Sequence, residues 1–135
     1  MHRSSKPVDL FLMFYEIQGV KQESGAPFRR WFHADDMDLS IWLEGSDPVR
    51  FQLSYNRHLG EKSILWNRDS GFSHFSIDDG EQQPGHYKAS PIVTGYLPMD
   101  FLQAITAFKQ HAEPMSEDIF DFVLQKLKEG HRILE

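Results

Sequence analysis

The middle of the chain alternates between apolar and polar positions, the pattern of β-strands that are buried on one face. Between residues 28 and 95, short runs of this kind are separated by turn sequences such as "GSDP", "RDSG" and "DDG". The apolar members of the two clearest runs all fall on odd positions: Leu39, Ile41, Leu43, Phe51, Leu53 and Tyr55. The pattern predicts an antiparallel β-meander.

Joining the apolar sets of successive strands predicts the registers. Leu43 is expected opposite Phe51, with Glu44 opposite Arg50, and Ile64 is expected between Leu53 and Phe75. A register shift of one residue between any two strands would move all the apolar side chains of one strand to the solvent-exposed face. The predicted core face of the sheet is made of Leu39, Ile41, Leu43, Leu53, Ile64 and Phe75.

After Pro98 the apolar spacing becomes helical. Two apolar stripes follow, separated by Pro114: Phe101, Leu102, Ile105 and Phe108, then Ile119, Phe120, Val123, Leu124 and Leu127. We expect the second helix to end at Gly130, a favourable C-cap residue. The prediction is a single α+β domain over 1–135: an antiparallel sheet of five to seven strands within 28–95 and two C-terminal helices within 99–130, packed on one face. No role is assigned to 1–27.

The second face of the predicted sheet carries an unusual mixture of side chains. The registers align Trp42, Gln52, Leu65 and His74 in one row and place Arg50 beside it. A face made only for solubility would be rich in Lys, Glu and Thr. This composition is typical of a surface that binds a small molecule or a peptide. An equally weighted alternative is that another element, such as residues 8–17, covers this face.

The stretch "GFSHFSIDDGEQQPGHYK", residues 71–88, is interpreted as a hairpin rather than a metal site. Its predicted register places Phe75 opposite Ala89, Ile77 opposite Tyr87, and Asp78 opposite His86 as a possible ion pair. His74 and Asp78 would be ~13 Å apart along one strand, too far to share a metal ion.

The other acidic cluster, "HADDMD" at 33–38, is interpreted as a hairpin loop with solvated carboxylates. Asp36, Asp38 and Ser40 begin like a calcium loop, but Ile41 and Asp47 occupy the positions that require Gly and Glu. The chain has no cysteine, no His-x-His and no helical histidine pair, so we predict no metal site and no cofactor.

The charge and hydropathy of the chain limit the classes of partner that it is expected to bind. The net charge of −6, with Arg29-Arg30 as the single adjacent basic pair, argues against nucleic acid. The most apolar run, "VDLFLMFY" at 8–15, contains Asp9 and is far shorter than the ~20 residues of a membrane helix. We therefore expect no membrane association and a cytoplasmic location, in keeping with the lack of cysteine.

Three functions remain open. The leading hypothesis is a non-enzymatic binding or interaction domain that uses Trp42, Arg50, Gln52, Leu65 and His74. The first alternative is a hydrolase-like enzyme in which His74 or His86 acts as general base and Asp78 orients it. The second is a homodimer whose aromatic face forms the interface.

A resemblance to a known family rests on four segments, which occur in this order: "RRWFHADDMDLSIWLEG", "FQLSYNR", "SILWNR" and "SIDDGEQQPGHYKASPIV". Over residues 28–127 the chain resembles a family of small bacterial proteins with no assigned activity. The resemblance implies a single compact bacterial domain, and it transfers no catalytic role to any residue.

Overall fold

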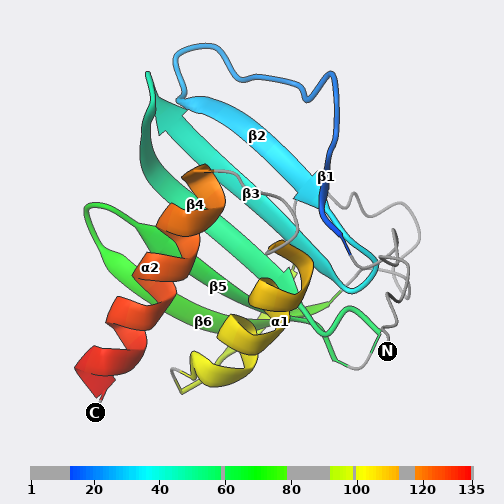
Figure 1. Ribbon diagram of the computed structural model, residues 1–135, viewed down its shortest axis with the longest axis vertical. Helices are drawn as coiled ribbons and strands as arrows, with labels where there is room; N and C mark the ends of the chain where they lie inside the picture. Colours follow the sequence, from blue (N-terminus) through cyan, green and yellow to red (C-terminus); the bar gives the residue numbers. More distant parts are fainter. Residues whose placement is uncertain (1–12, 59, 79–91, 99, 113–117, 135) are drawn as a thin grey trace, which may run out of the picture.

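The computed structural model describes residues 13–58, 60–78, 92–98, 100–112 and 118–134. In these residues, seven strands form one antiparallel sheet in which each strand pairs with the next along the chain (Figure 1). The strands are β1 (Tyr15–Glu16), β2 (Phe28–His33), β3 (Met37–Glu44), β4 (Asp47–Tyr55), β5 (Lys62–Asn67), β6 (Gly71–Asp78) and β7 (Ile92–Tyr96). The helices are α1 (Leu102–Ala112) and α2 (Asp118–Leu134). The predicted α+β meander with two C-terminal helices is confirmed.

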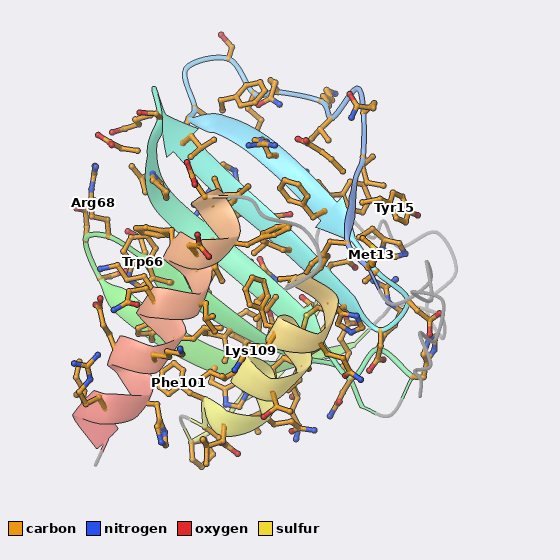
Figure 2. The ribbon with its side chains drawn as sticks, in the orientation of Figure 1. Met13, Tyr15, Trp66, Arg68, Phe101 and Lys109 are labelled. Atoms are coloured by element: carbon orange, nitrogen blue, oxygen red, sulfur yellow. The ribbon has the colours of Figure 1, made fainter. Side chains whose placement is uncertain are left out.

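Both helices lie on the same face of the sheet (Figure 1), which we call the core face. Five of the six predicted core residues are buried on this face: Leu39, Ile41, Leu43, Leu53 and Ile64. Trp66 of β5, which lies beside α2 (Figure 2), shows the packing. Its ring stacks on Phe51 at 5.6 Å and meets Phe122 of α2 edge-on at 5.4 Å. Burying each large apolar side chain here stabilises the fold by roughly 1.5–3 kcal/mol.

The register between β3 and β4 differs from the prediction by two residues. Ile41 lies opposite Phe51 and Trp42 opposite Arg50, so neither the Leu43–Phe51 nor the Glu44–Arg50 pair forms. The cause is a two-residue turn in which Gly45 has a φ of 63°, followed by a register shift beside Trp42. A shift of two residues preserves the alternation, so the faces of both strands are as predicted.

The register between β5 and β6 differs by one residue, which exchanges the faces of β6. Ile64 lies opposite His74 rather than Phe75, and Phe75 lies opposite Ser63. The cause is a three-residue turn that closes at Gly71, whose φ is 83°. Phe75 is therefore wrongly predicted for the core face: it lies on the opposite face, although only 6% of it is exposed.

The partner of β6 on its other side is also different. Asp78 lies opposite Ile92, Ile77 opposite Val93 and Phe75 opposite Tyr96. The predicted partners, at positions 86, 87 and 89, are outside the described residues. Asp78 pairs in the sheet with Ile92 instead of His86, and the Asp78–His86 ion pair stays a prediction. The prediction placed the returning strand directly after the "DDGEQQPG" loop, whereas the sheet uses the later β-branched run that begins at Ile92.

The described part of the N-terminal segment belongs to the edge of the sheet. Phe14 is buried in the core, and β1 pairs with β2 through Tyr15 opposite His33. Residues 13–17 therefore do not cross the second face of the sheet; residues 8–12 are outside the description. Neither described helix is long and apolar enough to cross a membrane.

Helix α2 continues past its predicted end. Gly130 lies inside the helix, which runs to Leu134, and it is buried against the ring of Phe101. A Cβ at position 130 would lie 2.5 Å from Cζ of Phe101. The glycine is thus explained by the close approach of a ring rather than by a helix end.

Candidate binding face

The face of the sheet opposite the helices, which we call the outer face, carries three rows of side chains across the strands. The strand registers place its residues in the following rows: Tyr15, His33, Asp38, Ser54, Ser63 and Phe75; Trp31, Ser40, Gln52, Leu65 and Ser73; and Arg29, Trp42, Arg50 and Asn67. Neither described helix packs on this face (Figure 1).

Four of the five predicted binding residues lie on the outer face. Trp42 is opposite Arg50, and Gln52 is opposite Leu65 in the neighbouring row. All four side chains are partly exposed. The fifth, His74, points to the core face because of the one-residue change in register.

His74 has a structural environment. Its Nδ1 lies 2.8 Å from the carbonyl oxygen of Pro98, and its Nε2 lies 2.7 Å from Oη of Tyr55. Because a carbonyl only accepts, Nδ1 carries the proton in a neutral ring, and Nε2 accepts the bond that Tyr55 donates. Burial, with a smaller effect of Asp100, raises the pKa of Tyr55 to about 12, so its hydroxyl remains a donor. This buried network removes His74 from the candidate binding residues.

Two arginines and two tryptophans alternate on the outer face. Cζ of Arg50 lies 4.2 Å from the ring centroid of Trp42, and Cζ of Arg29 lies 5.8 Å from the same centroid. Arg29 also approaches Trp31, at 5.4 Å. Because β2, β3 and β4 align Arg29, Trp42 and Arg50, the stack follows directly from the register. We call Trp31, Arg29, Trp42 and Arg50 the Arg–Trp stack.

Neither arginine of this stack is hydrogen-bonded to a carboxylate among the described residues. Arg29 donates from Nε and Nη2 to Oγ of Ser40, at 3.3 and 3.1 Å. Its pKa is lowered, chiefly by burial, although Asp38 and Glu23 act in the opposite direction. Arg50 has the Trp42 ring as its described contact and no hydrogen bond or ion pair in the described part of the chain. The stack therefore offers N–H groups to an external acceptor.

A second cluster surrounds Asp38. Its Oδ1 accepts hydrogen bonds from Nδ1 of His33 at 2.6 Å and from Nε1 of Trp31 at 3.2 Å. Its Oδ2 accepts from Nη2 of Arg57, which reaches this position after the left-handed residue Asn56, with a φ of 58°. Asp38 is 23% exposed, so the prediction of solvated carboxylates is wrong for this residue.

Three members of the outer face, Arg29, Trp31 and His33, were not predicted from the sequence, and Asp38 was predicted only as a solvated carboxylate of a hairpin loop. The signal was present, because these three residues alternate with Phe28, Arg30 and Phe32 in "FRRWFH". Pairing Phe32 with Leu39, as the structure does, aligns them with the predicted row. Arg57 lies beyond the end of β4, where the apolar–polar alternation of a strand cannot predict to which face a side chain points.

The comparisons add no relative: no protein-family model, curated protein or solved structure matches this chain. Within the described residues, no group of three or more His, Cys, Asp or Glu side chains is placed to hold a metal ion.

Proposed function

We propose that the protein is a cytoplasmic, non-enzymatic interaction domain that binds a peptide segment of a partner protein on the outer face. The observation that carries this proposal is the partly exposed Arg–Trp stack, on a face where neither described helix packs.

The composition of the face supports an interaction. Tyr, Trp and Arg are enriched in the cores of protein interfaces, whereas Lys and Glu are depleted. The three rows of the outer face contain Tyr15, two tryptophans and two arginines, and they contain neither Lys nor Glu. A face that served solubility alone would have the opposite composition.

The shape of the face favours an extended partner. A small ligand is usually enclosed in a concave site that buries most of its surface. The three rows instead extend over several strands, about 14 Å across β2–β5 and about 13 Å along them. Ser54, Ser63 and Phe75 of the first row are buried, so a short peptide lying on the sheet would contact the partly exposed members of the rows, which are concentrated on β2, β3 and β4.

Selection from a random peptide library displayed on phage tests the proposal. The full chain is the bait, and the recovered peptides are measured against wild type, Trp42→Ala and Leu102→Ala. Leu102 is exposed at the start of α1 and serves as the matched apolar control. We expect peptides that bind wild type and Leu102→Ala but lose affinity for Trp42→Ala. Failure to recover any peptide that depends on Trp42 would refute the proposal.

The His33–Asp38 bond supports a second candidate function, a hydrolase with His33 as general base. Asp38 fixes Nδ1 as the donor, and Nε2 of His33 has no described hydrogen-bond partner. In the sequence-based alternative this role fell to His74 or His86. The hydrolysis rate of p-nitrophenyl acetate tests this candidate: His33→Gln should abolish the turnover seen with wild type, and equal rates for the two would rule it out.

Homodimerisation through the outer face is disfavoured by charge. A two-fold axis through this face would bring the Arg–Trp stacks of two copies together, and neither Arg29 nor Arg50 is hydrogen-bonded to a described carboxylate that would neutralise its charge. A partner of opposite charge fits the same surface better.

A further inference from the structure

The charge on the outer face points to the chemistry of its partner. The chain has a net charge of −6, yet three arginines, Arg29, Arg50 and Arg57, reach this face. Asp38 is paired with Arg57, and Glu44 at the end of β3 contacts Arg68 at 3.3 Å. Among the described residues, neither Arg29 nor Arg50 makes a hydrogen bond or ion-pair contact with a carboxylate, although Asp38 and Glu23 act on the charge of Arg29 without contacting it.

The geometry of these two residues suits carboxylates. Arg50 lies with its Cζ 4.2 Å from the centroid of Trp42, and a guanidinium stacked on a ring keeps its edge free for two parallel hydrogen bonds to a carboxylate. Arg29 has already lost hydration through burial. A carboxylate placed beside it would compensate for the lost hydration of the guanidinium, since a desolvated cation is stabilised by a paired anion.

The spacing defines the acceptor further. Arg29 on β2 and Arg50 on β4 share one row and are separated by a single strand, so their backbones are about 10 Å apart. In a segment of polyproline II conformation, which has three residues per turn, acidic side chains three positions apart lie on the same side at a similar separation, about 9 Å. The residues between them would lie over Trp42, which offers a large apolar ring.

Nucleic acid is a weaker fit to the same arginines. A polyphosphate chain needs a stripe of positive charge, and the overall charge of −6 opposes it. An acidic peptide needs only the two neighbouring arginines, Arg29 and Arg50.

We propose that the segment bound by the outer face is acidic: it places one carboxylate on the edge of Arg50 and a second one beside Arg29, with Trp42 between them. This inference rests on the interaction function proposed above and specifies the partner of that same face.

The peptides selected against the full chain supply the test. We expect them to be enriched in Asp and Glu, with acidic residues about three positions apart. A synthetic copy of the strongest peptide is then titrated against wild type, Arg50→Gln and Arg132→Gln by isothermal calorimetry. Arg132 is exposed at the end of α2, so it controls for the loss of one positive charge.

The expected result is a loss of affinity of about tenfold or more for Arg50→Gln and less than about twofold for Arg132→Gln. Raising NaCl from ~50 to ~500 mM should weaken the wild-type complex, because it screens exposed charges. Together these results support an acidic partner.

The contrary outcomes separate the two proposals. Peptides that depend on Trp42 but are not acidic, and that bind Arg50→Gln as well as wild type, overturn this inference and leave the interaction function standing. Absence of any Trp42-dependent peptide overturns both. A small anion retained by wild type in native mass spectrometry, and lost from Arg50→Gln, would replace the peptide by a small-molecule ligand.

Discussion

The hydrogen bond between Tyr55 and His74 joins β4 to β6 inside the core, and the second nitrogen of His74 holds the carbonyl of Pro98 just before α1. The imidazole therefore has both of its nitrogens satisfied, which is the condition for burying such a polar ring. At the scale of single residues, this network determines several expected responses to substitution and pH.

Tyr55→Phe should destabilise the protein by about 1–3 kcal/mol, because Nε2 of His74 would remain buried without a donor. Urea denaturation measures this change. Tyr15→Phe is the matched control, since Tyr15 is 55% exposed, and we expect it to be nearly neutral. Equal midpoints for the two variants would contradict the assigned bond.

The raised pKa of Tyr55 predicts a loss of stability at high pH. The pKa is about 12 in the folded chain and about 10 in an unfolded chain. Between these values the unfolded state releases the phenolic proton while the folded state keeps it, so the free energy of unfolding falls as pH rises. Below pH ~10 this group contributes no pH dependence. Urea midpoints of wild type should therefore fall more steeply between pH ~10 and pH ~12 than those of Tyr55→Phe.

The tryptophans on opposite faces should respond differently to truncation. Trp66 is 8% exposed in the core, so Trp66→Ala should cost about 3–5 kcal/mol. Trp42 is partly exposed on the outer face, and Trp42→Ala should cost much less. Chemical denaturation compares them. A loss for Trp42→Ala as large as that for Trp66→Ala would assign Trp42 to the core and remove it from the binding face.

At the scale of elements, alternation predicts the faces of a strand well and its partners less well. The faces of β3 and β4 are as expected even though their register differs by two residues, since the alternation repeats every two residues. The turn before β6 is one residue shorter than assumed, and this moved His74 to the core face and Phe75 away from it. Alternation alone carries no information about the length of a turn, which depends on the backbone conformation of Gly71.

The helices illustrate a different limit. Their apolar stripes were visible in the sequence, and buried members such as Phe108, Phe120 and Leu127 pack in the core. The end of α2 was not visible, because a glycine can mark a helix end or leave room for a neighbouring ring. Only the position of Phe101 distinguishes these roles.

Gly130→Ala should destabilise the protein, by about 1–3 kcal/mol, even though alanine is the better helix former. The added methyl group would lie 2.5 Å from Cζ of Phe101, within a buried part of α2. A double-mutant cycle checks the cause: in a Phe101→Leu background, Gly130→Ala should be neutral or stabilising. The same loss in both backgrounds would mean that the ring is not responsible.

At the scale of the whole molecule, the backbone amides should be best protected from hydrogen exchange in the middle of the sheet. β3, β4 and β5 each have a neighbouring strand on both sides, and their residues Leu39, Ile41, Leu53 and Ile64 are fully buried. β1 has two residues and lies at the edge. Hydrogen exchange followed by mass spectrometry should show the slowest amides in β3–β5 and much faster ones in β1. Uniform exchange across the sheet would contradict this order.

The order of the strands in the sheet is the same as their order in the chain. Each successive pair can therefore form as a hairpin on its neighbour, and the loops closed at each step between β2 and β6 are short. Because loop closure costs entropy before contacts are gained, this arrangement lowers the barrier relative to sheets assembled from distant segments. We expect the packing of α1 and α2 onto the sheet to be the slower step, because it joins residues that are far apart in the chain, and the preformed sheet would then provide the surface on which both helices fold.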